Sequence, residues 1–316
     1  METLQQSKIK LPFVWDVIES EPDSFISFYK KNAGEIEKKL STFGAIKFKN
    51  VQIASTGSFQ HIVNSVSSNF MNYVDGNSPR TKLGENVYTS TEYDKMQKIT
   101  MHNELSYSAK WPNKLFFSCL QPATTGGETL LADSREVLRQ IDDSIVRQIR
   151  THGITYIRNL HGGGGIGPSW QDTFDTTDKA QLEKNCKAYE IDFTWRADGA
   201  IQLRQHSKGI IRHRSTHEEV WFNQIDQFHP YHLGEEMYDV LKVTYDTPED
   251  YPMWVQYGNR APIGDDVIKH VLEQVDKVTY APRWERNELL VVDNELASHG
   301  RNSYTGERKV LVAMSA

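Results

Sequence analysis

The stretch KITMHNEL, residues 98–105, decides how the fold is interpreted, because it places a histidine and a glutamate inside a short run of β-forming residues. On a strand, His102 and Glu104 would project from the same face, with their Cα atoms about 7 Å apart. Such a pair is either a polar stripe that faces water or two ligands of a metal site that face the interior. The surrounding sequence has to decide between these two interpretations.

Short segments of β-forming residues surround this stretch from Asn86 to Asp133, and Pro112, Pro122 and a Gly-Gly pair separate them. Their connections are too short for crossover helices, so they indicate an antiparallel sheet. Similar segments return near the C-terminus, after several segments with helical periodicity. We therefore expect a β-rich α+β fold with a double-stranded β-helix (jelly-roll) core, in which helices pack outside and are inserted between strands.

A single domain is expected, because 316 residues suit one large β domain. The expected parts are an N-terminal α/β elaboration over 1–75, metal-binding core strands over 86–133 and 287–316, and an insert of helices and strands over 134–286. The best helical pattern of the chain runs from residue 133 to residue 153, with a capping residue at its start and a glycine at its end.

Composition narrows the function classes. The chain has 42 acidic and 36 basic residues, a net charge of -6, and no basic runs, so nucleic acid is not an expected partner. Its two cysteines, Cys119 and Cys186, are far apart and outside metal-binding spacings, so buried thiols are expected. No stretch reaches the roughly 18 consecutive apolar residues of a membrane helix, and no signal peptide is evident. A soluble, cytoplasmic protein with no membrane partner is expected.

The spacing His-x-Glu occurs twice, at His102 and Glu104 and at His217 and Glu219. The second pair lies in the charged run RHRSTHEEVWF, which is typical of a solvated hairpin tip. The first pair lies within a β-forming segment that has further such segments on both sides. It is therefore the better candidate for a metal site, provided that a third ligand exists.

His299 supplies a candidate third ligand, because it follows the apolar run LLVV near the C-terminus. Two histidines and one carboxylate form the facial triad of non-haem Fe(II) oxygenases, which leaves coordination positions open for a cosubstrate and O2. Arg308 begins the next apolar segment, KVLVAM. A guanidinium that faces inward there needs a carboxylate partner, and a dicarboxylic cosubstrate would supply one.

The segments HNELSY, WPNKLFFSCLQPATTGGETLLADSREV and DNELASHGRNSYTGERKVLVAM carry a resemblance to a known family. Over nearly its whole length the chain resembles the taurine dioxygenase family of Fe(II)/2-oxoglutarate dioxygenases, and within it the branch of the syringomycin-pathway hydroxylase. The resemblance implies that His102, Glu104 and His299 bind iron. It also implies that Arg308 pairs with the distal carboxylate of 2-oxoglutarate, with the hydroxyl of Thr129 beside it.

Most of that family has aspartate where this chain has Glu104. A carboxylate of either kind argues against halogenation, where the halogenating relatives have a small residue, and favours hydroxylation. The resemblance implies Fe(II), 2-oxoglutarate and O2 as cofactors, and a small amino-acid substrate, either free or attached to a carrier protein, in specialised metabolism. Oxidative cyclisation and desaturation by the same chemistry stay open.

Four further residues are candidates for substrate binding: Arg80, Lys98, Arg204 and Asn223. Each can equally be a solvated or structural residue. Two alternatives from other classes also stay open. A zinc hydrolase can use two histidines and a glutamate, although it leaves Arg308 without a role. A metal-free jelly-roll binding module is the non-enzymatic alternative.

Overall fold

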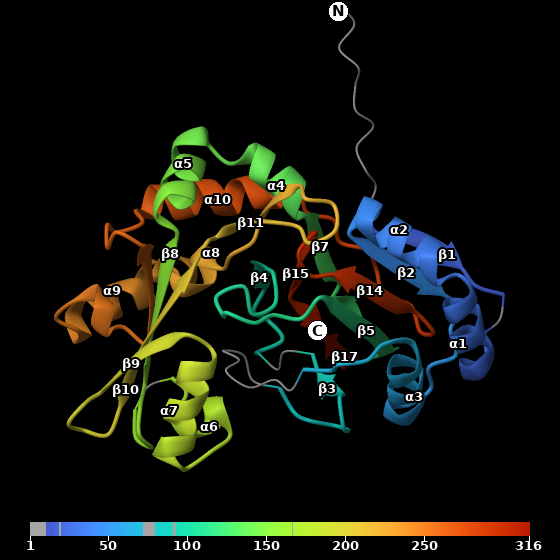
Figure 1. The fold of residues 1–316 in the computed structure, drawn as a ribbon, viewed down its shortest axis with the longest axis horizontal. Coiled ribbons are helices and arrows are strands. Elements are labelled where there is room, and N and C mark those ends of the chain that lie inside the picture. The colour runs from blue at the N-terminus through green and yellow to red at the C-terminus, as the bar shows by residue number, and fades with distance from the viewer. Residues whose placement is uncertain (1–10, 19, 72–79, 91–92, 166) are drawn as a thin grey trace, which may run out of the picture.

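The computed structural model describes residues 11–18, 20–71, 80–90, 93–165 and 167–316 (Figure 1). One sheet has six strands in the order β1-β2-β14-β5-β17-β3, and all neighbours except β1 and β2 are antiparallel. It therefore joins strands from both ends of the sequence. The bounds are β1 Phe13–Asp16, β2 Ala45–Lys49, β3 Tyr88–Thr89, β5 Lys114–Gln121, β14 Leu289–Asp293 and β17 Lys309–Ser315.

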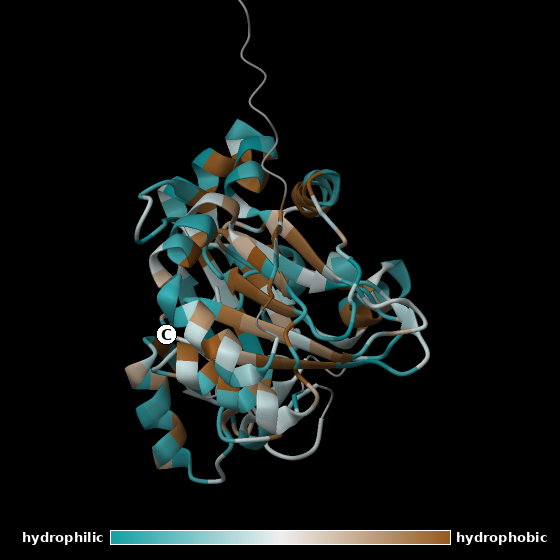
Figure 2. Ribbon diagram, turned by 90° about the vertical axis from the view of Figure 1, so that its right-hand side faces the viewer, coloured by the Kyte–Doolittle hydropathy of each residue, from teal (hydrophilic) through white to brown (hydrophobic). Residues whose placement is uncertain are grey.

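The side chains of the six-stranded sheet alternate between two apolar layers. Phe116 and Val291 pack with the helices α1, α2 and α3 on one face. Phe117 and Leu290 point to the other face, where they pack against the second sheet. Figure 2 shows hydrophobic residues along the central strands and hydrophilic ones on the outer helices. The three helices are α1 Pro22–Lys31, α2 Ala33–Phe43 and α3 Thr56–Val66.

The second sheet has three antiparallel strands in the order β4-β15-β7, namely β4 Ile99–His102, β15 Ala297–Arg301 and β7 Thr129–Asp133. Leu131 of β7 and Ala297 of β15 share an apolar cluster with Phe117 and Leu290 of the six-stranded sheet. The two sheets therefore pack against each other. A two-stranded pair, β6 Thr125–Gly126 with β16 Tyr304–Thr305, lies next to them in sequence.

The segment between β7 and β14 holds a separate four-stranded antiparallel sheet in the order β13-β8-β10-β9, together with the hairpin β11-β12. Most of its helices lie on the side of the molecule away from α1, α2 and α3, but Arg135, in the first of them, donates to the carbonyls of Ser41 and Thr42 in α2 (Figure 1). The strands are β8 Ile154–Leu160, β9 Ile191–Trp195, β10 Ile201–Ser207, β11 Ile210–Arg212, β12 Glu219–Trp221 and β13 Met253–Tyr257. The helices are α4 Ser134–Gln140, α5 Asp143–His152, α6 Trp170–Phe174, α7 Lys179–Ala188, α8 Ile225–Phe228, η1 Pro230–Leu233, α9 Glu235–Thr244, η2 Pro248–Asp250 and α10 Asp265–Lys277.

The long helix predicted from residue 133 to residue 153 is two helices, α4 and α5. The break is at Asp142, whose carboxylate accepts a hydrogen bond from the backbone N–H of Ser144 and so caps α5. The segment thus has two N-terminal capping residues, Asp133 for α4 and Asp142 for α5, where only one was expected. Over the described ranges, no helix combines the length and the apolar character needed to cross a membrane.

A buried ion pair joins β2 to the start of β14 inside the six-stranded sheet. The ammonium of Lys47 on β2 donates to the carboxylate of Glu288, just before β14, over 2.8 Å, and the two side chains are 4% and 2% exposed. We expect Lys47→Met to lower the free energy of unfolding by about 3–5 kcal/mol, because Glu288 would stay buried without its hydrogen-bonded counter-charge and would keep only Lys49, whose Nζ lies 3.9 Å away. Urea unfolding followed by circular dichroism measures this loss.

The matched control is Lys114→Met on β5, which breaks a more exposed pair with Glu37. This change should cost less than about 1 kcal/mol. The double variant Lys47→Met/Glu288→Leu should regain most of the stability, because it removes both charges. Equal losses for the two single variants would contradict the importance of the buried pair.

Candidate metal centre

His102, Glu104 and His299 come together in the structure. All three side chains are buried, and one ligand atom from each lies within 4.8 Å of the others. His102 is the last residue of β4 and pairs directly with His299 of β15 across the antiparallel ladder, which places their ring centroids 4.3 Å apart. The pairing of two strands thus joins residues that are almost 200 positions apart in the sequence.

Glu104 reaches the cluster by a different route from the one expected. Strand β4 ends at His102, and Glu104 lies in the turn that follows, next to Leu105 with a positive φ of 56°. The prediction that strand alternation places Glu104 and His102 on one face is therefore wrong. The turn still brings Oε2 of Glu104 to 3.6 Å from Nε2 of His299.

His102 is prepared as a neutral ligand. Nδ1 of His102 lies 2.9 Å from the carbonyl oxygen of Thr100, which can only accept; in the tautomer with the proton on Nδ1, this hydrogen bond leaves the lone pair of Nε2 for a metal. Burial, together with the nearby His299, lowers the pKa of His102 to about 3, so the ring is neutral at pH 7. The side-chain amide nitrogen of Gln227 donates to the same carbonyl over 3.1 Å and lies 3.0 Å from Nδ1, so it also holds this side of the ring.

The carboxylate of Glu104 is held in its charged form. Burial alone would raise its pKa, but the guanidinium of Arg80 and the contact with His299 outweigh burial and hold the pKa well below its usual range. Two imidazoles and one carboxylate thus converge in a buried place, with lone pairs available. This donor set fits a divalent ion such as Fe(II).

Arg80 is the one substrate candidate that the structure brings to the cluster. Its Nη2 donates to Oε2 of Glu104 over 2.6 Å, and its side chain is 3% exposed. Lys98 is half exposed and pairs with Asp276, while Asn223 is buried and donates to the carbonyl of Gly209; both line another cavity. Arg204 lies on β10 and pairs with Glu249.

A small cavity adjoins the cluster, and the two residues predicted for the cosubstrate, Thr129 and Arg308, line it. Its full lining is Arg80, Ser90, Ile99, His102, Phe117, Thr129, His299, Gly300, Arg301 and Arg308. Strand β7 begins at Thr129, and Arg308 directly precedes β17. The two sheets therefore place them in one cavity with the histidines.

Arg308 is a partly buried cation. Its Nε donates to the carbonyl of Gly127 over 2.8 Å, and its Nη1 donates to Oγ of Ser90 over 3.0 Å. Burial and the like charge of Arg301 lower its pKa to about 10. No carboxylate among the residues that the structure describes forms an ion pair with it, so the cavity holds a positive charge that suits an anion.

The sequence reasoning missed several residues of this cavity. Arg301 is buried and donates to the carbonyls of Asp94 and Gln97. Its position two residues after His299 on a strand was a usable signal, because such residues share a face. Nε1 of Trp284 donates to Oγ1 of Thr129 over 3.0 Å and so leaves the hydroxyl proton of Thr129 free to be donated. Nothing in the sequence pattern linked Trp284 to this site.

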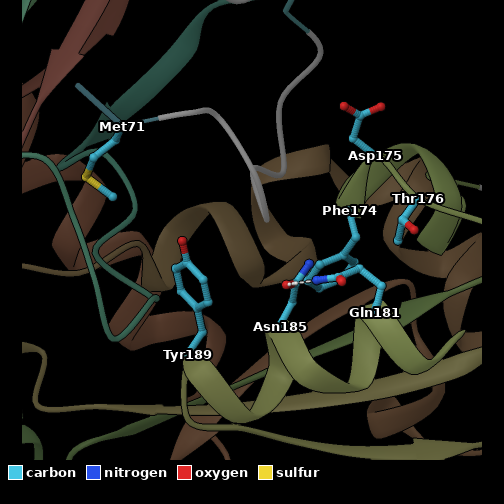
Figure 3. Close-up of a pocket in the computed structure, with 7 residues that line it drawn as sticks. All are labelled: Met71, Phe174, Asp175, Thr176, Gln181, Asn185 and Tyr189. Atoms are coloured by element: carbon cyan, nitrogen blue, oxygen red, sulfur yellow. Dashed lines mark hydrogen bonds between the residues drawn. The ribbon is translucent and has the colours of Figure 1, made fainter. Parts of the chain in front are cut away.

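A larger cavity of about 430 Å³ lies elsewhere, beside α6 and α7 (Figure 3). It is lined by Met71, Phe174, Asp175, Thr176, Gln181, Asn185 and Tyr189. Gln181 and Asn185 hydrogen-bond to each other along α7. This cavity contains neither a histidine nor any residue of the His-Glu-His cluster, so its size does not identify it as the reaction site.

Comparisons with known proteins agree with this geometry. Dapdiamide synthesis protein DdaC of Enterobacter agglomerans is 34% identical over 279 residues, which cover 88% of this chain and 84% of that protein. A clavaminate synthase-like protein of Arabidopsis thaliana is 27% identical over 298 residues, which cover 92% and 87% of the two chains.

Two solved structures share the fold. The crystal structure of AAD-2 in complex with Mn(II) and N-oxalylglycine has a TM-score of 0.56 at 12% identity and covers 98% of this chain and 96% of that chain. PvcB, described as an Fe, alpha-ketoglutarate dependent oxygenase from an isonitrile synthetic pathway, has a TM-score of 0.53 at 11% identity, with coverages of 96% and 85%.

The sequence model described as "Taurine catabolism dioxygenase TauD, TfdA family" matches residues 17–314, which is almost the whole chain. The protein is accordingly an oxygenase that uses Fe(II), 2-oxoglutarate and O2. The chain belongs to the TauD/TfdA family of dioxygenases.

Proposed function

We propose that the enzyme hydroxylates an unactivated C–H bond of an amino acid or an amino-acid-derived substrate, free or attached to a carrier protein. The observation that carries the proposal is the buried His102, Glu104 and His299 cluster, which shares a cavity with the partly buried cation Arg308. The names of the relatives support a biosynthetic setting, because one of them belongs to dapdiamide synthesis and another is clavaminate synthase-like.

His102, Glu104 and His299 are assigned as the iron ligands in this proposal. When bound, the metal with 2-oxoglutarate and O2 supplies the oxidising chemistry, with succinate and CO2 as coproducts. The protein supplies orientation and exclusion of water. Thr100 fixes the His102 ring through Nδ1, and Arg80 balances the charge of Glu104.

Arg308 is assigned to the distal carboxylate of 2-oxoglutarate, with the hydroxyl of Thr129 beside it. A guanidinium that has two hydrogen-bonded partners but, among the described residues, no counter-ion is costly to keep away from water, and a dianionic cosubstrate offsets that cost. Arg80 is kept as the residue for a substrate carboxylate, because it lines the same cavity. The cavity walls thereby divide into a cosubstrate side and a substrate side.

We also infer that the core is a double-stranded β-helix, or jelly roll. Three observations support it: the six-stranded and three-stranded sheets pack face to face, nearly all their pairings are antiparallel, and both contain strands from early and late parts of the chain. The chain from 1–316 then forms one domain, in which 134–286 is an insert between core strands.

The family assignment removes the zinc hydrolase and the metal-free binding module as alternatives for this site. The family assignment does not fix which product forms at the substrate carbon. Hydroxylation adds one oxygen atom, whereas desaturation and ring closure remove two hydrogen atoms. These outcomes differ in product mass, so one measurement distinguishes them.

Iron and cosubstrate binding can be tested first. Protein mixed anaerobically with Fe(II) should turn lilac when 2-oxoglutarate is added, because a chelate of the cosubstrate on ferrous iron has a visible charge-transfer band. Absorption spectroscopy measures this band. Glu104→Ala serves as the control that lacks the carboxylate ligand, and a colourless mixture with folded wild-type protein would contradict the assigned site.

The role of Arg308 is tested by Arg308→Ala. The affinity for 2-oxoglutarate should fall by about 1.5–3 kcal/mol, or roughly 10- to 150-fold, because charged hydrogen bonds are lost. Fe(II) binding should change little, because Arg308 is not a ligand. Titration of the lilac band measures both.

The matched control for this variant is Arg204→Ala, which removes a partly exposed arginine of the four-stranded sheet. It should leave the affinity for 2-oxoglutarate unchanged. If Arg308→Ala and Arg204→Ala behave alike, Arg308 does not bind the cosubstrate.

The substrate class is tested by mass spectrometry. Amino acids, both free and loaded on carrier proteins, are incubated with the enzyme, Fe(II), 2-oxoglutarate and O2. A true substrate should gain one oxygen atom and yield one succinate per product. Succinate formation without any modified amino acid across the panel would count against the proposed substrate class.

A further inference from the structure

The tripeptide Asn-Glu-Leu occurs three times in the chain, and two of its copies, at 103–105 and at 294–296, lie beside residues of the metal cluster. The first copy follows His102, and the second lies in the connection between β14 and β15, shortly before His299. The structure brings the two copies into contact: Nδ2 of Asn103 donates to the backbone carbonyl of Asn294 over 2.7 Å. The first turn carries Glu104, and the second precedes His299.

Asn294 holds the backbone of Glu104 at two points. Its Oδ1 accepts from the N–H of Glu104 over 2.7 Å, and its Nδ2 donates to the carbonyl of Glu104 over 2.9 Å. The second hydrogen of Nδ2 is donated to the carbonyl of Pro112, also over 2.9 Å. The backbone N–H of Asn294 donates to the backbone carbonyl of Asn113. Asn294 is completely buried, and each of its polar groups has a partner.

This contact replaces a missing strand partner. His102 and His299 are placed by the β4–β15 ladder, but Glu104 lies beyond the end of β4 and takes no part in it. A carboxamide offers one acceptor and one donor with the spacing of a peptide group, so Asn294 can pair with Glu104 as a neighbouring strand would. The backbone from which the Glu104 side chain projects is thereby tied to the segment that carries His299.

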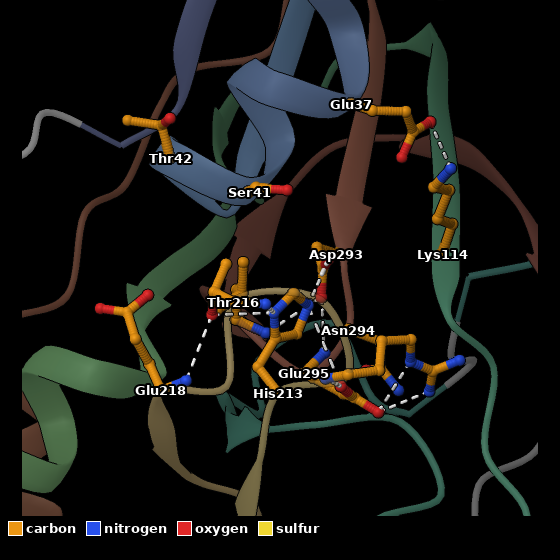
Figure 4. Close-up of polar contacts among 12 residues, drawn as sticks. Glu37, Ser41, Thr42, Lys114, His213, Thr216, Glu218, Asp293, Asn294 and Glu295 are labelled. Atoms are coloured by element: carbon orange, nitrogen blue, oxygen red, sulfur yellow. Dashed lines mark hydrogen bonds and ion pairs between the residues drawn. The ribbon is translucent and has the colours of Figure 1, made fainter. Parts of the chain in front are cut away.

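The turn that carries Asn294 is itself well supported (Figure 4). Oδ1 of Asp293 accepts from the backbone N–H groups of Glu295 and Leu296, while Oδ2 lies 3.1 Å from Nε2 of the buried His213. The carboxylate of Glu295 accepts from the indole of Trp111 over 2.9 Å. A side chain anchored in such a network can hold Glu104 in one place.

We propose that Asn294 is a positioning residue, which sets where the carboxylate of Glu104 meets the metal. This inference rests on the proposed function, in which Glu104 is an iron ligand. The amide is required because a carboxylate at this position would have no hydrogen to donate to the carbonyls of Glu104 and Pro112. Asparagine is therefore specified, and the nearly isosteric aspartate is excluded.

The test compares N294D with N159D. Asn159 on β8 is a matched control, because its Nδ2 also donates to two backbone carbonyls, those of Glu249 and Tyr251, in the four-stranded sheet. Anaerobic competition with a chromophoric chelator measures the affinity for Fe(II). N294D should lower that affinity 10- to 100-fold, as is typical for the loss of an outer-shell partner, whereas N159D should leave it unchanged.

A double-mutant cycle separates positioning from general damage. In the Glu104→Ala background the carboxylate ligand is absent, so N294D should no longer change the Fe(II) affinity. Equal losses in both backgrounds, or no loss in folded N294D, would overturn the proposal. N294A is measured as well because it removes the amide without adding a charge. If neither variant folds, Asn294 is a structural residue and the proposal fails.

The two proposals fail in different ways. If wild-type protein gives no lilac band with Fe(II) and 2-oxoglutarate, the proposed iron site is wrong. If the wild type gives the band and N294D matches it in affinity and intensity, only the role of Asn294 is wrong.

Discussion

The pairing of β4 with β15 is the constraint on which the site depends. It sets His102 directly opposite His299, so a metal-binding pair arises from one cross-strand contact between segments remote in sequence. The three-stranded sheet keeps this pair in place because Leu131 and Ala297 pack it against the six-stranded sheet. The apolar contacts between the two sheets therefore hold His102 and His299 in position. The metal site lies beside this close-packed core.

Charge is the second organising feature. Three arginines, Arg80, Arg301 and Arg308, line the cavity, while Glu104 is the acid beside it. Such an excess of buried positive charge is unfavourable in a protein that binds nothing there. It suits an enzyme whose cosubstrate carries two carboxylates. Burial lowers the pKa of His102, whereas Glu104 keeps its charge against burial because Arg80 and His299 favour the carboxylate.

Much of this could be read from sequence patterns, because the informative segments are regular. The apolar runs LLVV and KVLVAM form β14 and β17, and the charged pair at His217 is outside the metal cluster found among the described residues. The failures have local causes. Asp142 starts a new helix inside a continuous helical pattern, and β4 stops before Glu104. Hydrophobic periodicity does not show where a helix or strand ends, because a single local contact can decide the last residue.

The sequence by itself determined the kinds of residue available to the site: two histidines, a carboxylate and an arginine at the start of an apolar strand. These types define the chemistry because donor atoms and charge do not depend on the fold. Tertiary structure alone decided which polar residues serve it. The fold brings Arg80 to the metal cluster and joins Asn294 to Glu104. It places Lys98, Arg204 and Asn223 elsewhere. The physical reason is that contacts between distant segments depend on strand register and turn geometry, which no local pattern encodes.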